Sequence, residues 1–149
     1  MHETMSDVGG PGFFLTAIVP RWNPVYSVFS WINCGDPPPL VLGAGKTVDE
    51  LATRPDPPLG VLERARTFHR HQRRLLAGDR VVMYTDGISR RRSGDGQFGT
   101  EGIVRAARGA PAHSAAATAR AIQEAVVAAM EDPLQDDAAV VVLAVSGPQ

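Results

Sequence analysis

Short apolar runs alternate with clusters of turn formers through the first half of the chain, a pattern typical of strands joined by turns. Residues 13–19 and 25–32 are rich in aromatic and β-branched side chains, and the turn formers of residues 20–24 separate them. The pattern therefore predicts two strands joined as a hairpin. Three consecutive prolines at residues 37–39 exclude a helix there, and a short strand is predicted at residues 40–42.

Two apolar strands frame the second half of the chain. The first covers residues 80–85 and stops at an Asp-Gly pair, and the second covers residues 138–145. The polar residues between positions 67 and 76 fit an exposed edge strand or a helix equally well, and we favour a strand.

Two helices are predicted between these strands. Thr100 would cap a short helix that runs to Arg108, because its hydroxyl can accept from unpaired amides and Glu101 suits the positive helix end. Residues 114–130 are rich in alanine and repeat apolar side chains every four residues, as an amphipathic helix does. Strands first, helices next and one last strand predict an α+β fold with an antiparallel sheet or sandwich flanked by helices.

Composition and charge narrow the classes of function. The 149 residues are 44% hydrophobic, which suits one ordinary domain, and the net charge of −1 provides no basic field for nucleic acid. The longest apolar run is eight residues, against the roughly 20 that span a bilayer. The first residues lack the positive flank of a signal peptide, and Cys34 is the single cysteine, so we expect a cytoplasmic protein.

Two carboxylates stand where an apolar strand meets a polar turn. Asp86 directly follows residues 80–85, and Asp137 directly precedes residues 138–145. If these strands are antiparallel neighbours, both carboxylates lie at the same edge of the sheet, where oxygen ligands suit Mg²⁺ or Mn²⁺ rather than Zn²⁺. The alternative is structural, since Asp-Gly is a common turn pair and an aspartate before a strand often caps a loop.

Other candidate sites give weaker signals. His69 and His71 are two residues apart but have no third ligand, and such a pair is more often surface polarity than a metal site. Cys34 fits a buried inert thiol better than a nucleophile. Residues 43–46 lack the spacing of a phosphate-binding loop. Nine arginines between residues 63 and 92 form a solvated face or, less often, a docking surface for a phosphorylated partner.

Seven ordered landmarks resemble the SpoIIE-like branch of the PPM-type (2C-like) serine/threonine phosphatases. They are Phe13-Phe14-Leu15-Thr16-Ala17, Asn33-Cys34-Gly35-Asp36-Pro37-Pro38-Pro39, Pro58-Leu59-Gly60, Gly78-Asp79-Arg80, Tyr84-Thr85-Asp86-Gly87, Phe98-Gly99 and Asp136-Asp137-Ala138. The resemblance implies an antiparallel β-sandwich flanked by helices, with two Mn²⁺ or Mg²⁺ ions at one end. Such ions activate a water for attack on a phosphoserine or phosphothreonine.

The resemblance also implies roles for individual residues. Asp86 and Asp137 match metal ligands of the family, and Gly87 would let the backbone turn tightly beside the ion. Asp136 and Asp36 are expected to be neighbours of the site. The second aspartate of the pair 136–137 is the one that matches the ligand position.

The chain also departs from the family pattern. The family's first third supplies a Gly-Asp segment that bridges both ions and, later, a Gly-His-Gly segment, and no segment of this sequence corresponds to either. We therefore expect residues 13–146 to correspond to the carboxy-terminal two-thirds of the domain, after a flexible segment at residues 1–12, and to hold at most one ion. Asn33-Cys34-Gly35-Asp36 stands where Asn-Ala-Gly-His is usual, and Ser89-Arg90 stands where an acid is usual.

The resemblance implies a metal-dependent phosphatase whose substrate is a phosphoserine on a STAS-type anti-sigma antagonist, as in partner switching. The alternative is a truncated, catalytically inactive remnant that binds such an antagonist or its kinase. An incomplete sheet would leave an exposed edge through which two copies could dimerise. No nucleic-acid partner and no membrane insertion are expected.

Overall fold

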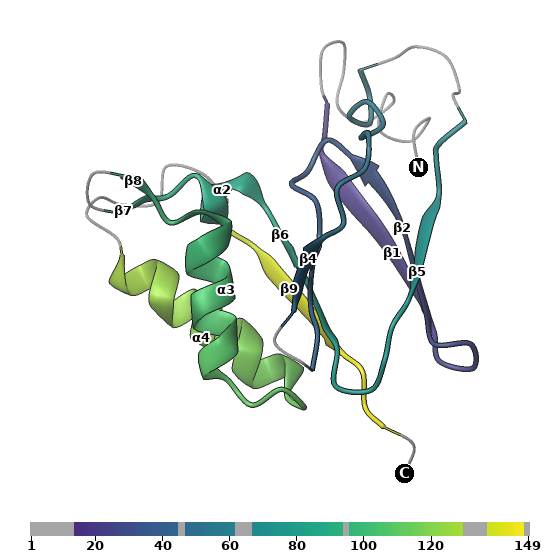
Figure 1. The fold of residues 1–149 in the computed structure, drawn as a ribbon. Helices are drawn as coiled ribbons and strands as arrows, with labels where there is room; N and C mark the ends of the chain where they lie inside the picture. Colours follow the sequence, from purple (N-terminus) through teal and green to yellow (C-terminus); the bar gives the residue numbers. More distant parts are fainter. Residues whose placement is uncertain (1–13, 45–46, 62–66, 94–95, 130–136, 148–149) are drawn as a thin grey trace. The chain divides into compact units, whose positions relative to one another are not determined.

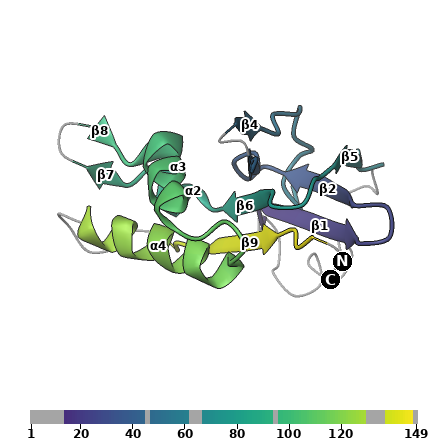
Figure 2. The ribbon, with the colours of Figure 1, turned by 60° about the horizontal axis from the view of Figure 1, so that its bottom comes forward.

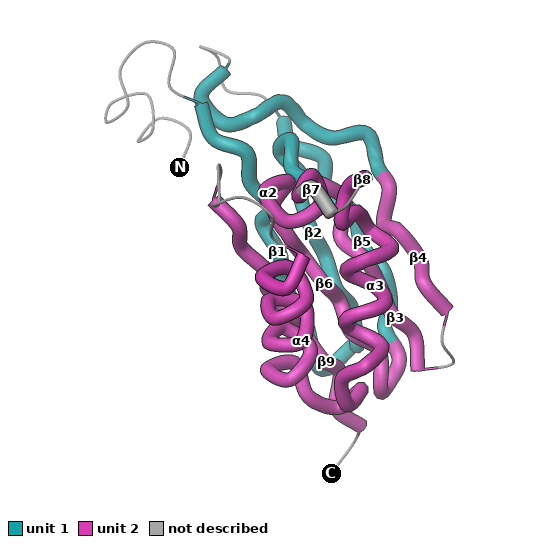
Figure 3. The backbone as a smooth tube through the Cα atoms, turned by 90° about the vertical axis from the view of Figure 1, so that its left-hand side faces the viewer, with its two compact units in different colours: residues 1–36, 53–75 teal, residues 37–52, 76–149 magenta. Residues whose placement is uncertain are grey.

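The computed structural model describes residues 14–44, 47–61, 67–93, 96–129 and 137–147 (Figure 1). The chain divides into two compact units, each assembled from two separate stretches of sequence (Figure 3). Unit 1 contains residues 1–36 and 53–75, and unit 2 contains residues 37–52 and 76–149. The segment 1–12, for which flexibility is predicted, lies outside the described residues.

Unit 1 contains a three-stranded antiparallel sheet. Its strands are β1 (Ala17–Asn23), β2 (Val28–Cys34) and β5 (His71–Arg74), and they lie in the order β1-β2-β5. The predicted hairpin is thus confirmed as β1 and β2. The preference for an edge strand within residues 67–76 is also confirmed, because β5 pairs with β2 on one side of the described sheet.

The predicted position of the hairpin turn is wrong. The sequence pattern predicts the turn at residues 20–24, but Pro20 lies inside β1, which runs to Asn23. A proline is tolerated there because β1 pairs only with β2 in the described sheet, so one side of the strand needs no amide donor. The turn instead follows Asn23, whose Oδ1 accepts from the amide of Val25 at 3.1 Å, and Ser27 adopts a positive φ of 52°.

Unit 2 contains a four-stranded antiparallel sheet. Its strands are β3 (Leu40–Leu42), β4 (Val48–Glu50), β6 (Arg80–Tyr84) and β9 (Val140–Ala144), in the order β4-β3-β6-β9. The pairing that the sequence analysis expected between the strands at 80–85 and 138–145 is confirmed, because β6 and β9 are antiparallel neighbours. All residues of β3 and β6 are buried.

The described part of unit 2 also contains three helices and a small hairpin. The helices are α2 (Asp86–Ser89), α3 (Gly99–Gly109) and α4 (Ala115–Ala128), and the hairpin pairs β7 (Arg92–Ser93) with β8 (Gly96–Gln97). Helices α3 and α4 lie together on one side of the sheet (Figure 2). No helix in the described part of the chain is long and apolar enough to cross a membrane.

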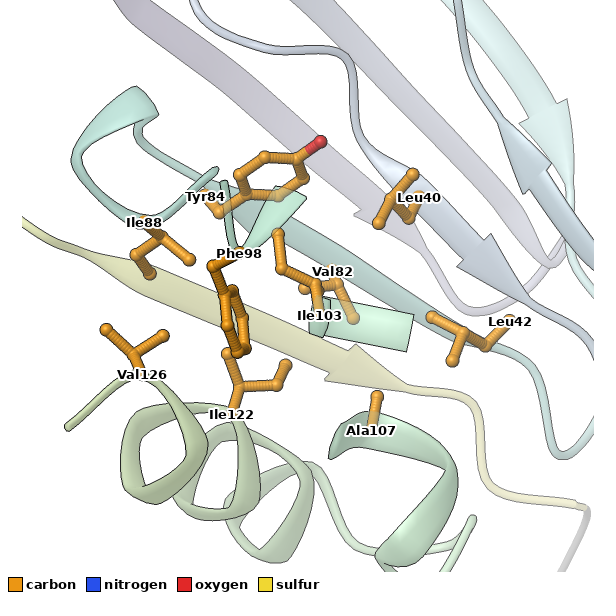
Figure 4. Close-up of a cluster of buried hydrophobic side chains, with 10 residues drawn as sticks. All are labelled: Leu40, Leu42, Val82, Tyr84, Ile88, Phe98, Ile103, Ala107, Ile122 and Val126. Atoms are coloured by element: carbon orange, nitrogen blue, oxygen red, sulfur yellow. The ribbon is translucent and has the colours of Figure 1, made fainter. Parts of the chain in front are cut away.

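The core of unit 2 forms where α3 and α4 meet the sheet (Figure 4). Side chains two apart on β6 and four apart on each helix point into the same cluster, as the periods of strand and helix require. Such burial contributes roughly 1.5–3 kcal/mol for each large apolar side chain. The cluster consists of Leu40, Leu42, Val82, Tyr84, Ile88, Phe98, Ile103, Ala107, Ile122 and Val126.

The starts of the two long helices differ from each other. The predicted cap at Thr100 is wrong, because α3 begins after Phe98 with no side-chain cap and the Thr100 hydroxyl hydrogen-bonds the buried Tyr84 instead. Helix α4 has a side-chain cap, in which the Ser114 hydroxyl accepts from the amide of Ala117 at 3.1 Å. The tertiary contact with Tyr84 therefore replaces the predicted capping role of the Thr100 hydroxyl.

Candidate metal centre

Hydrogen bonds of Thr85 connect the end of β6 to the segment that leads into β9. The Thr85 amide donates to the Ala139 carbonyl at 3.1 Å, and the Thr85 hydroxyl accepts from the Ala139 amide at 3.0 Å. The same hydroxyl donates to the Asp137 carbonyl at 3.1 Å. These bonds continue the β6–β9 pairing beyond the strands and hold the Asp137 backbone beside the residue that precedes Asp86.

Gly87 lies against the Asp137 backbone. A Cβ atom at position 87 would stand 2.4 Å from the Asp137 carbonyl oxygen and 3.0 Å from its carbonyl carbon, so no side chain fits. A tight turn is the predicted role of Gly87, but the residue lies in helix α2 and is not among the glycines with positive φ. The glycine is needed for the close approach of two backbone segments rather than for its torsional freedom.

Asp86 and Asp137 therefore belong to two segments that meet at one end of the unit 2 sheet. Asp86 is the first residue of α2, where its charge suits the positive end of the helix. Its side chain is 42% exposed, and Asp137 is exposed. Carboxylates that remain in contact with water can change partners without a large desolvation cost.

Asp86 already has one charged partner. Its Oδ2 lies 3.2 Å from Nη1 of Arg90, one helical turn later, and the Arg90 side chain is 74% exposed. An exposed ion pair of this kind contributes at most about 1 kcal/mol. Arg90 therefore competes only weakly with a cation for Asp86.

Asp136 and Asp36 are the two further residues expected to be neighbours of the site. Asp136 lies outside the described residues. Asp36 belongs to unit 1, in a turn where its carbonyl accepts from the Asn33 side chain at 2.9 Å and Gly35 has a φ of 98°. Cys34 in the same turn is buried, and burial together with the nearby carboxylates of Asp56 and Asp36 raises the pKa of its thiol. The thiol is thus poorly suited to act as a nucleophile.

One hydrogen-bonded pair in unit 1 was not predicted from the sequence. Asp56 is 8% exposed, and its two oxygens contact the His69 amide and the His69 Nδ1, each at 2.7 Å. Burial acts to raise the pKa of Asp56, but the hydrogen bonds from His69 and the charges of His69 and His71 bring it below its ordinary value. The proline-rich loop that carries Asp56 gave no signal of this contact.

The donor set at the end of β6 fits a single hard cation. Mg²⁺ commonly keeps several waters and binds through one or two carboxylates together with substrate phosphates, and Asp86 and Asp137 offer that chemistry. Within the described residues, no group of three or more His, Cys, Asp or Glu side chains is placed to hold a metal ion. The described residues therefore do not fit a complete two-ion centre.

A sequence model of the family described as Stage II sporulation protein E (SpoIIE) matches residues 1–146. The chain belongs to the SpoIIE family. Homologues in the SpoIIE family are serine/threonine phosphatases. No curated protein matches the chain by sequence.

Solved structures share the SpoIIE-family fold. The phosphatase domain of the cell fate determinant SpoIIE from Bacillus subtilis, presoaked with Mn, is 17% identical with a TM-score of 0.70, over 90% of this chain and 58% of that chain. The RsbU and RsbW domains of a Mycobacterium tuberculosis protein give 22% identity and a TM-score of 0.68, over 90% of this chain and 38% of that chain. The catalytic domain of the phosphatase PstP with two manganese ions gives 17% identity and a TM-score of 0.67, over 95% and 63%.

These likenesses confirm the predicted α+β fold, with antiparallel sheets and flanking helices. The chain spans 58% of the length of the Bacillus subtilis SpoIIE phosphatase domain to which it is similar.

Proposed function

We propose that the protein is a Mn²⁺- or Mg²⁺-dependent serine/threonine phosphatase and that this chain supplies Asp86 and Asp137 as ligands of one ion. The observation that carries the proposal is the meeting of the Asp86 and Asp137 segments at one end of the sheet, held by Thr85. Support for the metals comes from the solved relatives, one soaked with Mn and one holding two manganese ions.

In this proposal each residue at the end of β6 has a defined task. Asp86 and Asp137 hold the ion, Thr85 fixes the separation of their backbones, and Gly87 leaves room for the Asp137 backbone. A bound divalent ion supplies an activated water and offsets charge on phosphoryl oxygens. No covalent enzyme intermediate is required.

We further propose that the substrate is a phosphoserine on a STAS-type anti-sigma antagonist and that the protein acts in the cytoplasm. Support comes from the similarity to SpoIIE and to RsbU domains. Residues 13–146 would then be the carboxy-terminal two-thirds of a PPM-type phosphatase domain. A second copy could pair with an exposed sheet edge, since β1 and β5 end the described sheet of unit 1.

The test is hydrolysis of a phosphoserine peptide during a Mn²⁺ titration. We expect turnover that requires Mn²⁺ and falls at least about 100-fold in Asp86→Asn and in Asp137→Asn, because each change removes a carboxylate donor. Glu101→Gln is the matched control, since Glu101 is an exposed acid on α3 of the same unit. Turnover that survives in both aspartate variants would contradict the proposal.

One observation favours a second function, a binding module without turnover. Among the described residues, the segments that meet at the end of β6 supply the acids Asp86 and Asp137, and no group of three metal-ligating side chains is found. The same peptide distinguishes the two functions. Binding of the phosphopeptide without hydrolysis at saturating Mn²⁺, unchanged in Asp86→Asn, would favour the binding module.

A further inference from the structure

One face of the unit 1 sheet carries exposed arginines. Residues directly opposite each other in antiparallel strands point to the same side of a sheet, as do residues two apart in one strand. The register places Arg21 of β1 opposite Ser30 of β2, and Ser30 opposite Gln72 of β5. Arg74, two residues after Gln72, shares their face. We call this side of the sheet the outer face of unit 1, and Arg21, Gln72 and Arg74 are exposed on it.

The opposite face of the same sheet is apolar and closed. Phe29 and Trp31 are buried there with their ring centroids 5.6 Å apart, and the His71 ring lies at the same distance from Trp31. Strand alternation therefore divides the sheet into a packed inner face and an outer face in contact with water. Arg70, two residues before Gln72, is also exposed and extends the basic surface along β5.

The arginines of this surface have no acidic partner. Within the described part of the chain, the side chains of Arg21, Arg70 and Arg74 form no hydrogen bond or ion pair. The acids in the described part of unit 1 are Asp36 and Asp56, against five arginines, and Asp56 is buried. The outer face thus presents positive charge that the described residues of its own unit do not balance.

The β5 strand also presents backbone groups that can pair with another strand. The Leu75 amide donates to the Ser27 carbonyl at 2.9 Å, so Leu75 directs its backbone groups toward β2. The direction of these groups alternates along an antiparallel strand, and those of Gln72 and Arg74 therefore point away from β2. In the described sheet, whose order is β1-β2-β5, no strand pairs with them (Figure 1). Such an edge can accept one more strand.

We propose that the β5 edge binds an extended acidic segment of a partner protein, which adds to the sheet as a further strand. The backbone of that segment would pair with Gln72 and Arg74. Its acidic side chains, at every second position, would face Arg70 and Arg74, and Arg21 adds positive charge to the same face. In strand addition of this kind the main-chain bonds supply affinity, and the side chains supply specificity.

The charge and the backbone of β5 together select this partner. Two copies of β5 paired antiparallel would place arginine opposite arginine, and like charges in that position destabilise a sheet. Of the two edges of this sheet, β5 is thus the one unsuited to a second copy. An acidic strand meets opposite charges instead. A nucleic acid would match the charge but lacks the amides and carbonyls that the edge pairs with.

This surface is separate from the candidate metal centre, because Asp86 and Asp137 belong to unit 2. The inference does not depend on the proposed phosphatase activity. It is tested by binding alone, in EDTA, which removes divalent ions. A failure of hydrolysis would therefore leave this test intact, and a failure of peptide binding would leave the proposed function intact.

The test is fluorescence anisotropy of a dye-labelled peptide, Thr-Glu-Val-Glu-Val-Glu-Thr, added to the full chain in EDTA. The control peptide carries glutamine in place of each glutamate. We expect saturable binding of the acidic peptide that weakens with added salt, and binding of the glutamine peptide at least about tenfold weaker, because its side chains carry no charge.

Two variants separate the charge of the edge from its strand pairing. Arg70→Gln combined with Arg74→Gln should weaken binding of the acidic peptide at least about tenfold. Arg105→Gln combined with Arg120→Gln is the matched control, since both are exposed arginines on helices of unit 2 and the net charge changes equally. Gln72→Pro removes an amide that points away from β2, so β5 should stay paired while the peptide binds about tenfold more weakly.

A change in the peptide tests the same main-chain bonds should Gln72→Pro fail to fold. One peptide is N-methylated at its valines and the other at its glutamates. Only alternate amides of an added strand face β5, so one of the two peptides should lose binding and the other should keep it.

The proposal is overturned if the acidic and glutamine peptides bind equally, or if the variant at Arg70 and Arg74 binds as tightly as its control. It is also overturned if both N-methylated peptides bind like the parent peptide. Tighter binding of a single-stranded oligonucleotide or of phosphatidylserine vesicles than of the acidic peptide would assign the charge to another partner. Self-association of the chain that disappears in the variant at Arg70 and Arg74 would assign the edge to a second copy, and that too would overturn the proposal.

Discussion

The charged residues at the two ends of β6 differ in sign and in exposure to water. At its first residue, Arg80 is 6% exposed and bonded to neutral acceptors at the end of α3. Just beyond its last residue, Asp86 is 42% exposed and paired with the exposed Arg90. One strand of five residues thus joins a charge that is fixed in the interior to a charge that remains in water.

Arg80 thus carries a charge with fixed partners in the structure, whereas Asp86 carries a charge whose partner can be exchanged. A buried cation without bonded acceptors would cost several kcal/mol, so Arg80 is stable only with its acceptors in place. Burial also lowers the pKa of the Arg80 guanidinium. The pair at Asp86 contributes at most about 1 kcal/mol and can be replaced by another cation. A ligand site needs an exposed charge that can exchange its partner. A helix terminus in the interior can use a buried charge with fixed partners.

The largest effect on stability is expected at the exposed end. Gly87→Ala places a Cβ atom 2.4 Å from a backbone oxygen of Asp137, and we expect it to lower the free energy of unfolding by about 3 kcal/mol. Urea denaturation measures this change. Gly109→Ala is the control, since a Cβ there has no atom within 4 Å and should be neutral or stabilising. Equal effects of the two substitutions would show that the close approach at Gly87 is not a real constraint.

A somewhat smaller loss is expected at the buried end. Arg80→Met leaves the Ala107 and Ala110 carbonyls without this donor, and we expect the free energy of unfolding to fall by about 2 kcal/mol. Mn²⁺ affinity should not change, because the residue lies at the other end of β6. Arg105→Met, on the exposed side of α3, controls for loss of an arginine. A loss of Mn²⁺ affinity in Arg80→Met with unchanged stability would contradict this assignment, because Arg80 would then act in metal binding and not in stability.

Asp56, a buried carboxylate in unit 1, extends the comparison between buried and exposed charges. Burial acts to raise the pKa of Asp56, but the bonds from His69 and the charges of both histidines outweigh it and lower that pKa. A folded-state pKa below the unfolded value of about 3.9 means that the carboxylate stabilises the protein above about pH 4. This contribution is lost as the pH falls through the folded-state pKa.

Asp56→Asn should therefore reduce the acid sensitivity of the protein. Between pH 6 and pH 3, we expect the unaltered chain to lose about 1 kcal/mol more unfolding free energy than the Asp56→Asn variant. Urea denaturation at the two pH values measures the difference. Identical acid profiles for Asp56→Asn and the unaltered chain would refute the assigned role of His69.

The smallest effect is expected at Arg90. Arg90→Gln removes the partner that competes for Asp86, so Mn²⁺ affinity should rise about two- to fivefold, with less than about 0.5 kcal/mol change in stability. A Mn²⁺ titration followed by calorimetry measures the affinity, and Arg105→Gln is the control. Weaker Mn²⁺ binding in Arg90→Gln would mean that Arg90 supports the site rather than competes for it.

Local patterns predicted much of the framework. The β6–β9 pairing and the meeting of the Asp86 and Asp137 segments followed from two apolar runs that each border an aspartate. The apolar repeat of α4 likewise predicted that Ile122 and Val126 face the core. These features depend on periodicity within a few residues, which a sequence displays directly. The assignment of the two aspartates as metal ligands stays a prediction.

Contacts between distant residues account for what the sequence did not predict. Pro20 looked like a turn former, yet an edge strand accommodates it. Thr100 looked like a helix cap, yet Tyr84 takes its hydroxyl. The bond between Asp56 and His69 spans 13 positions, and no periodicity connects them. The reason for a glycine at position 87 likewise lies in a backbone segment far along the chain.

The bond between Thr85 and Asp137 spans 52 positions of the sequence. During synthesis, β6 therefore leaves the ribosome well before the segment that completes its edge has been translated. Contacts of such long range form slowly, because a large loop must close first. The end of β6 that carries Asp86 is thus among the last parts of unit 2 to mature, and a nascent chain presents Asp86 without Asp137.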